Sequence, residues 1–178
     1  MKINHSNIKK AKKFLDNEEC VAVPTETVYG LAANAYSDIA TKKIFQLKKR
    51  PRNNPLIVHY SNLNDLKKDC LINKEFLKLY KKFCPGPLTF ILPLKKKSKI
   101  SKNVTNNKKN LAVRFPKHKI MRALLKKVNY PLAAPSANLS TRVSAVNPND
   151  VKDDFGKKIK YILNGGPSSI GVESTIID

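Results

Sequence analysis

Lys48-Lys49-Arg50-Pro51-Arg52-Asn53-Asn54-Pro55-Leu56-Ile57-Val58-His59 is the stretch from which the fold of this chain can be predicted. Four cations lie within five residues, two prolines stiffen the segment, and the apolar run at 56–60 predicts a strand. A basic loop that enters a strand holds several positive groups at the mouth of a sheet. This arrangement suits a ligand that carries several negative charges.

Hydrophobic patterning predicts helices and strands that alternate along the rest of the chain. The expected helices are residues 6–15, 37–48, 75–83, 119–128 and 149–155. The expected strands are residues 20–23, 56–60, 88–94, 111–115, 131–134, 159–163 and 174–178. Because strands and helices alternate with irregular connections, we expect an α/β fold in which a twisted, mixed sheet is flanked by helices.

Residues 95–110 interrupt this pattern with seven lysines. A segment with so much charge is expected not to pack against a core. It predicts either a mobile lid or a solvated connector, and we favour the connector.

The chain length bounds the number of domains. Its 178 residues favour one domain over positions 1–178, long enough to bury a hydrophobic core. The sequence stops within the apolar run Ile176-Ile177-Asp178, which favours a domain truncated at its C-terminus. No membrane-spanning run and no signal peptide are visible, so we expect a cytoplasmic protein without a membrane partner.

Charge and cysteine content narrow the classes of ligand. The net charge of +22 is typical of a protein that binds nucleic acid or a polyanion, but a lysine-rich genome would produce the same excess. Both interpretations stay open. Cys20, Cys70 and Cys84 are widely spaced, so we expect reduced thiols. The cysteines and histidines show no metal-ligand spacing, and no metal bound by protein side chains is expected.

Pro24-Thr25-Glu26-Thr27 places two hydroxyls and a carboxylate directly after the strand at 20–23. Ligands bind at strand ends in α/β folds, so Thr27 is a candidate for binding a small polar substrate. The alternative is that Thr25 or Thr27 only caps a helical turn over residues 28–33, with Glu26 in its first turn.

A second polar segment, Ala134-Pro135-Ser136-Ala137-Asn138, follows the strand at 131–134. Its small residues let the backbone approach a ligand, although a simple turn explains the same pattern. The glycine-rich run at 165–175 lacks the ending of a P-loop. No Ser-His-Asp order or Cys-His pair stands out, so the chemistry that remains is positioning and charge stabilisation of phosphate.

Six segments in order resemble the threonylcarbamoyl-AMP synthase family, the YrdC-like proteins. They span almost the whole chain, and six in order form a specific pattern. The matching segments are Pro24-Thr25-Glu26-Thr27-Val28-Tyr29-Gly30-Leu31, Lys48 through His59, Pro85-Gly86-Pro87-Leu88-Thr89, Val113-Arg114-Phe115-Pro116, Pro135-Ser136-Ala137-Asn138-Leu139-Ser140 and Gly171-Val172-Glu173-Ser174-Thr175. The resemblance implies a YrdC-like (DHBP synthase-like) fold with a concave basic face.

The resemblance also implies a reaction and its site. L-threonine, bicarbonate and ATP, with Mg²⁺, would give threonylcarbamoyl-AMP and pyrophosphate, and a threonylcarbamoyl transferase partner would use the product to modify adenosine 37 of tRNA. By motif, Lys48 and Arg50 would be the catalytic groups. The implied ATP contacts are Lys48, Arg50, Asn54, Asn110, Asn138 and Ser144. The implied threonine contacts are Thr27, His59, Arg114, Ser136 and Ser174.

Two other interpretations stay open. The same fold with a charge of +22 is compatible with a noncatalytic module that grips tRNA or double-stranded RNA. A carbamoyl-handling domain like that of hydrogenase maturation proteins shares the fold as well, although a short chain that stands alone argues against it.

Overall fold

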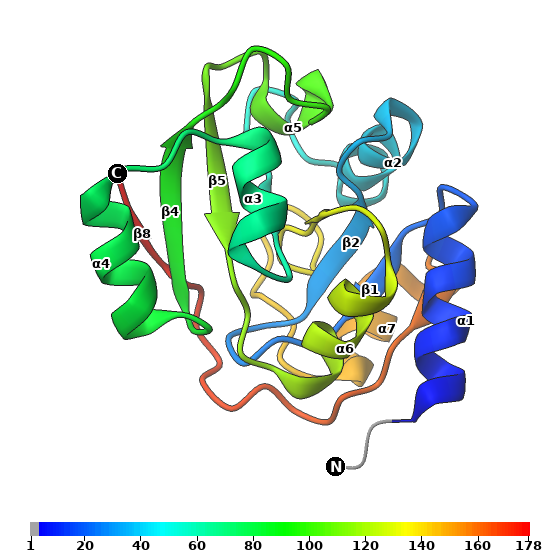
Figure 1. Ribbon diagram of the computed structural model, residues 1–178. Helices are drawn as coiled ribbons and strands as arrows, with labels where there is room; N and C mark the ends of the chain where they lie inside the picture. Colours follow the sequence, from blue (N-terminus) through cyan, green and yellow to red (C-terminus); the bar gives the residue numbers. More distant parts are fainter. Residues whose placement is uncertain (1–3) are drawn as a thin grey trace.

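An eight-stranded mixed sheet forms the centre of the computed structural model, which describes residues 4–178 (Figure 1). In sheet order its strands are β7 (Tyr161–Ile162), β1 (Val21–Val23), β2 (Gly30–Asn34), β6 (Leu132–Ala133), β3 (Ile57–His59), β5 (Asn110–Arg114), β4 (Leu88–Pro93) and β8 (Thr175–Ile177). β1 with β7, β3 with β5 and β4 with β8 are parallel pairs, and the other neighbours are antiparallel. The predicted α/β fold with a mixed sheet is confirmed.

Helices cover this sheet at the five predicted places and at two others. They are α1 (His5–Asp16), α2 (Asp38–Lys48), α3 (Leu63–Asp69), α4 (Lys74–Phe83), α5 (Lys102–Thr105), α6 (Lys119–Lys127) and α7 (Pro148–Phe155), followed by the 3₁₀ turn η1 (Gly156–Lys158). Ser37 caps α2, because its side chain accepts the amide hydrogen of Ala40. Asn4 caps α1, because its side chain accepts the amide hydrogens of Ser6 and Asn7.

Two clusters of buried residues hold the layers together. One joins α1 and α6 to β1, with Leu15, Met121 and Val23 fully buried. The other extends from α2 to α4 and includes Phe76 and Phe90, whose rings meet edge to face with centroids 4.9 Å apart. Aromatic pairs in this geometry stabilise beyond the area that they bury, so the sheet offers a rigid support for the loops at its ends.

Two local expectations were wrong, and the helix α3 was missed. Residues 28–33 do not form a helical turn, because Gly30–Asn34 is the strand β2, hydrogen-bonded to β1 and β6. The lysine-rich segment 95–110 is not an unpacked loop: Ile100 and Val104 are buried, and α5 lies within it. The helix α3 was not predicted, because Leu63 and Leu66 are its only apolar residues.

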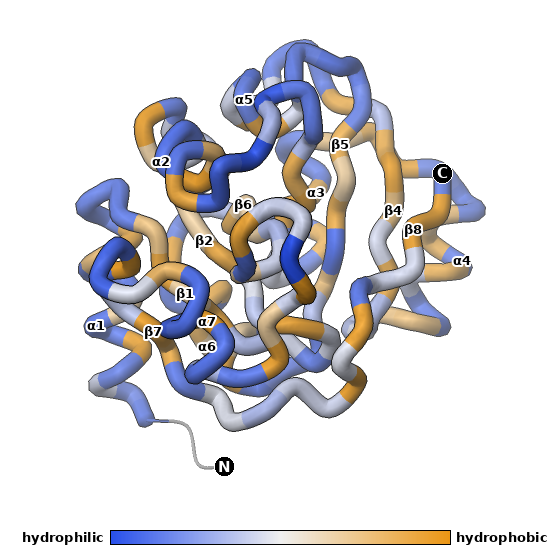
Figure 2. The backbone as a smooth tube through the Cα atoms, turned by 180° about the vertical axis from the view of Figure 1, so that it is seen from behind, coloured by the Kyte–Doolittle hydropathy of each residue, from blue (hydrophilic) through white to orange (hydrophobic). Residues whose placement is uncertain are grey.

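One face of the sheet is only partly covered at β3, β5 and β4. Ala112 is partly exposed, and so are the residues paired with it on either side, Ile57 and Ile91, whereas Val113 is buried on the other face. Figure 1 shows α3 and α4 in front of β4 and β5, and Figure 2 shows these strands from behind. Alternate residues of a strand point to one face, so Arg114 shares this open face with Ala112.

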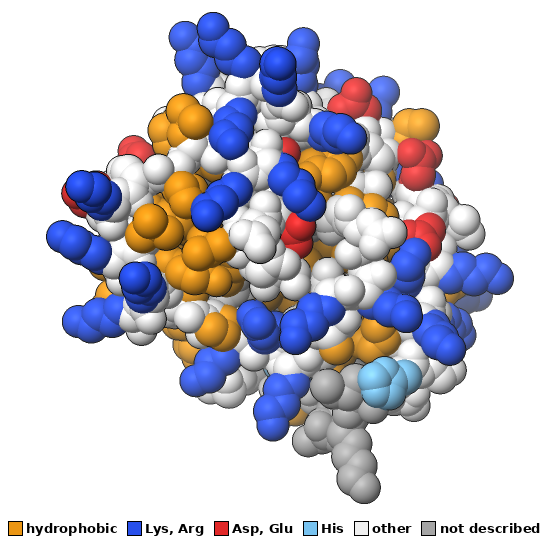
Figure 3. Space-filling view, viewed as in Figure 1, with side chains coloured by type: hydrophobic (Ala, Val, Ile, Leu, Met, Phe, Trp, Pro, Cys, Tyr) orange, Lys and Arg blue, Asp and Glu red, His pale blue; other side chains and the backbone are white. Residues whose placement is uncertain are grey.

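The basic charge is widely distributed over the surface. On the face seen in Figure 3, Lys and Arg side chains spread across the whole surface, with apolar side chains between them. Whether the open face is basic, as the resemblance implies, stays a prediction. No helix within residues 4–178 is long and apolar enough to cross a membrane.

Candidate active site

Lys48, the last residue of α2, points into the protein rather than into solvent. Its side chain is 1% exposed, and its Nζ donates to the carbonyl oxygens of Ser136 and Asn138, each at 2.5 Å. Burial lowers the pKa of Lys48 to about 8, and the nearby Arg50 charge contributes. The ammonium therefore fixes the loop after β6. Its predicted contact with phosphate stays a prediction.

Arg50 lies beside this loop with most of its guanidinium free. Nε donates to the carbonyl of Asn54 at 3.3 Å, and Nη2 donates to the carbonyl of Pro55 at 3.2 Å. Both bonds are made within the basic loop, so they set the loop's shape and leave other N–H groups for a ligand. The side chain of Asn54 is exposed next to them.

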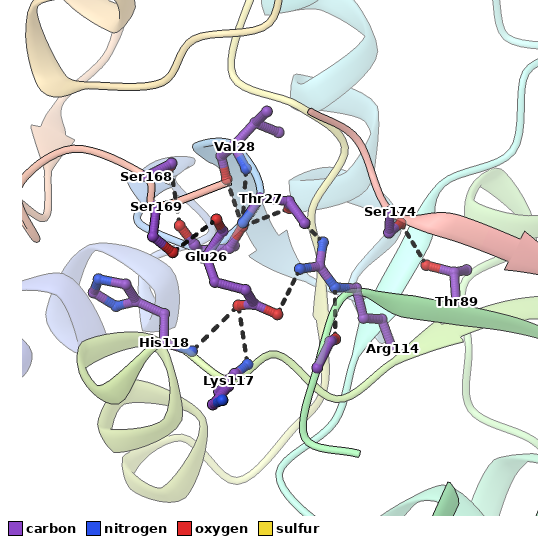
Figure 4. Close-up of polar contacts among 12 residues, drawn as sticks. Glu26, Thr27, Val28, Thr89, Arg114, Lys117, His118, Ser168, Ser169 and Ser174 are labelled. Atoms are coloured by element: carbon purple, nitrogen blue, oxygen red, sulfur yellow. Dashed lines mark hydrogen bonds and ion pairs between the residues drawn. The ribbon is translucent and has the colours of Figure 1, made fainter. Parts of the chain in front are cut away.

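Arg114, at the end of β5, is the centre of a second polar cluster (Figure 4). Its Nη1 donates to Thr27 Oγ1 at 2.8 Å, its Nη2 to Glu26 Oε1 at 2.9 Å, and its Nε to the carbonyl of Gly86 at 3.4 Å. Thr25 Oγ1 donates to the carbonyl of Val28, so the Thr27 hydroxyl donates to Thr25 and accepts from Arg114. This network folds the loop after β1 onto the sheet.

His59 is the neighbour of Arg114 on β3 and faces the same side of the sheet. Its ring is 2% exposed, and neither ring nitrogen has a hydrogen-bond partner within residues 4–178. Burial, aided by the Arg114 charge, lowers the pKa of His59 to about 3. The imidazole is therefore neutral at physiological pH. Its one donor and one acceptor have no partner among the described residues, and it is a poor base.

The loop before β8 links the two clusters through adjacent residues. Ser174 Oγ lies 2.7 Å from the hydroxyl of Thr89, which pairs with Arg114 in the sheet. Glu173 accepts a hydrogen bond from Ser144 at 2.7 Å, and its charge partly offsets the burial that lowers the pKa of Lys48 and the pKa of Arg50. Because Glu173 and Ser174 are adjacent, we treat the Lys48 and Arg50 loop and the Arg114 cluster as one candidate site.

The remaining predicted residues lie toward the basic loop. Asn138 is buried, and its amide donates to the carbonyls of Leu139 and Arg142. Asn110 is exposed at the start of β5, on the same face as Arg114 and four residues away. That separation is roughly 13 Å along a strand. Along β5 the candidate site thus extends from Arg114 to Asn110.

Three polar residues of the candidate site were not among the predicted site residues. Glu26, Thr89 and Glu173 each lie within a quoted motif and make a side-chain contact to a predicted site residue. A carboxylate inside a motif that otherwise suits anions is the signal that could have identified Glu26 and Glu173. Both offset the positive charge of the arginines.

The arrangement suits binding and charge stabilisation rather than covalent catalysis. No cluster of three or more His, Cys, Asp or Glu residues that could hold a metal is found within residues 4–178. The hydroxyls of Thr27 and Ser174 have no histidine or lysine among their hydrogen-bond partners there. The candidate site offers cationic and hydroxyl donors on a rigid sheet.

The sequence is similar to those of curated threonylcarbamoyl-AMP synthases. The chain is 43% identical to the threonylcarbamoyl-AMP synthase of Pyrococcus abyssi over 180 residues, and 44% identical to that of Bacillus subtilis over 175 residues. The alignments cover 99% and 98% of this chain but 52% and 50% of those proteins. The chain therefore spans about half the length of these curated relatives.

Solved structures and a family model agree with this similarity. The crystal structure of P. abyssi Sua5 complexed with L-threonine superposes with a TM-score of 0.97 at 42% identity, covering 100% of this chain and 52% of that one. The Sua5, YciO and YrdC family model, which carries the description "Telomere recombination", matches residues 13–178. This chain belongs to the Sua5/YciO/YrdC family.

Proposed function

We propose that this chain condenses L-threonine, bicarbonate and ATP into threonylcarbamoyl-AMP and pyrophosphate. The observation that carries the proposal is the loop before β8, whose adjacent residues Glu173 and Ser174 connect the Lys48 and Arg50 loop to the Arg114 cluster. The names of the two curated relatives and the threonine complex of P. abyssi Sua5 support the same reaction.

The reaction needs no group from the protein to form a covalent bond. The neutral amine of threonine attacks bicarbonate and water leaves, which gives a carbamate. A carbamate oxygen then attacks the α-phosphorus of ATP, and pyrophosphate leaves. The protein has to hold three substrates in line and neutralise their charge, and gathering reactants in this way lowers the barrier substantially.

The Arg114 cluster and the Arg50 loop bind different substrates in this reaction. The carboxylate of threonine binds to the free N–H groups of Arg114, and His59 supplies the donor or acceptor that its buried ring leaves unpaired. Thr27, Ser136 and Ser174 complete the pocket. The triphosphate lies toward Arg50, Asn54, Ser144 and Asn138, with Lys48 shaping the loop and Asn110 near the nucleoside. Mg²⁺ enters on the phosphates of ATP as part of that substrate.

A pyrophosphate-release assay tests the proposal. With MgATP, threonine and bicarbonate we expect AMP-containing product and pyrophosphate in equal amounts, and omission of either threonine or bicarbonate should abolish both. The product then passes to a threonylcarbamoyl transferase partner that acts on tRNA. Pyrophosphate release that continues at the same rate without threonine would overturn the synthase assignment.

The same preparation distinguishes the noncatalytic alternative. RNA binding through surface lysines would weaken steeply as salt increases, because bound counterions are released. No turnover together with tight, salt-sensitive binding of tRNA or double-stranded RNA would favour an RNA-binding module over a synthase.

A further inference from the structure

Glu26 is a buried carboxylate whose position is set from two sides. It is 6% exposed, and its Oε2 accepts the backbone amides of Lys117 at 2.9 Å and His118 at 3.2 Å, just before α6. Its Oε1 accepts from Arg114 Nη2 at 2.9 Å. Figure 4 shows the carboxylate between these amides and the guanidinium. The amides hold the carboxylate, and the carboxylate in turn holds the arginine.

The charge state of Glu26 is consistent with this role. Burial alone raises the pKa of a carboxyl, but the Arg114 charge and the hydrogen bonds outweigh burial and lower the pKa of Glu26 below its ordinary value. The residue is therefore ionised at neutral pH. Hydrogen bonds that involve an ionised donor or acceptor are roughly twice as strong as those between neutral groups.

Arg114 is restrained at three of its nitrogens by two segments, the loop after β1 and the residues just before β4. Gly86 accepts from Nε, Thr27 from Nη1 and Glu26 from Nη2. A guanidinium is planar and has five N–H groups, so three contacts fix its plane and leave one N–H on each terminal nitrogen. The pair of free N–H groups is the kind of fork that binds a carboxylate.

We propose that Glu26 is a positioning residue that orients the Arg114 guanidinium so that its two free N–H groups bind the carboxylate of the amino-acid substrate. The inference rests on the proposed function, because it takes threonine as the ligand. Glu26 does not touch the substrate. It favours a substrate with a carboxylate because it holds the Arg114 guanidinium in the orientation that binds this group.

The test compares two ligands that differ only at the group that Arg114 would bind. Calorimetry measures the affinity of the wild-type chain and of Glu26→Gln for L-threonine and for L-threonine amide, which lacks the carboxylate. We expect the wild type to prefer threonine. Because hydrogen bonds to charged groups are strong, Glu26→Gln should bind threonine roughly 10-fold more weakly. Its affinity for threonine amide and for MgATP should change less than about 2-fold.

A purely structural role gives a different result. If Glu26 only stabilised the loop, Glu26→Gln would lose affinity for threonine and for threonine amide by the same factor, and that result overturns the proposal. The matched control is Glu19→Gln, which removes a carboxylate from a surface ion pair with Lys43 at 3.0 Å. It should leave both affinities unchanged.

Two further outcomes are decisive. If Glu26→Gln does not fold, Glu26→Asp keeps the charge on a shorter side chain and should show a weakened preference for threonine; failure of both variants to fold shows a structural role and overturns the proposal. If the wild-type chain binds no threonine, the proposed function fails first. That outcome is distinct from a wild type that binds threonine while Glu26→Gln keeps the full preference.

Discussion

Replacing Lys48 by methionine separates the cost of burying its charge from the benefit of its hydrogen bonds. Lys48→Met keeps the length of the side chain and removes the ammonium that bridges the carbonyls of Ser136 and Asn138. Each carbonyl that is left unpaired costs about 1–3 kcal/mol. The same substitution also removes a charge that the protein interior disfavours, so the two effects oppose each other near neutral pH.

The pH dependence of stability isolates the charge term. The pKa of Lys48 falls from an ordinary 10.5 to about 8, which corresponds to about 3 kcal/mol against the charged form at about 1.4 kcal/mol for each pKa unit. Between these two pKa values the unfolded chain binds more protons than the folded chain, so folding becomes more favourable as pH rises. The penalty is present in full below about pH 8 and is lost by about pH 10.5.

Urea unfolding at several pH values measures this effect. The free energy of unfolding of the wild type minus that of Lys48→Met should increase by about 3 kcal/mol from about pH 7 to about pH 10.5. The other lysines titrate alike in both proteins and cancel. Lys43→Met, at a half-exposed lysine paired with Glu19, is the matched control and should show a nearly constant difference. If the free energies of unfolding of Lys48→Met and the wild type change in parallel with pH, burial does not disfavour the charge of Lys48, and the reasoning is refuted.

Three other predictions follow from the site and its support. Arg50→Ala should lower ATP turnover by roughly 100-fold without unfolding the protein, because Arg50 bonds only within its own loop; steady-state kinetics and thermal melting check both parts. His59 should stay neutral down to about pH 4 in an NMR titration, since its pKa lies near 3, and a midpoint near 6.5 would contradict its burial. Gly165→Ala should destabilise the fold by roughly 1–3 kcal/mol in urea unfolding, because a Cβ there would lie 2.5 Å from Pro24; unchanged stability would show that this loop can shift.

Sequence patterning predicted elements well where the period was strong. The helices around Leu15, Ile44 and Phe76 were found because apolar residues repeat along one face. β2 was missed for the opposite reason. Gly30-Leu31-Ala32-Ala33-Asn34 contains no β-branched residue and no alternation, since a strand between two others and covered on both faces has no exposed side to mark it.

The packing of the segment 95–110 was not predicted because the segment is highly charged. Its seven lysines suggested a solvated loop, yet Ile100 and Val104 are buried and the Ser101 hydroxyl donates to Asp38 at 2.5 Å. Long cationic side chains can leave a buried backbone while their ends stay in water. A high lysine content therefore indicates that the ends of the side chains are solvated, but not that the backbone is exposed.

The candidate site shows the same division between residue type and geometry. Motifs indicated Lys48, Arg114 and His59 from their chemistry and order, but not that the Lys48 ammonium would be used on backbone carbonyls. Nor could they indicate that Glu26 would be the partner of Arg114, because that contact joins positions 88 residues apart. Side-chain direction depends on how distant loops fold over the sheet, and local patterns carry no such information.

The charged residues of the candidate site explain why its geometry matters more for ligand recognition than the chain's excess of lysine. Lys48, Arg50 and Arg114 are opposed there by Glu26 and Glu173, so the three cations and two carboxylates leave one net positive charge against +22 for the whole chain. Surface lysines more than about 8 Å from a ligand are largely screened at physiological salt. For the proposed synthase we therefore expect the triphosphate to be recognised by N–H groups of Arg50, which backbone carbonyls fix in direction, and the threonine carboxylate by those of Arg114, which Glu26 fixes.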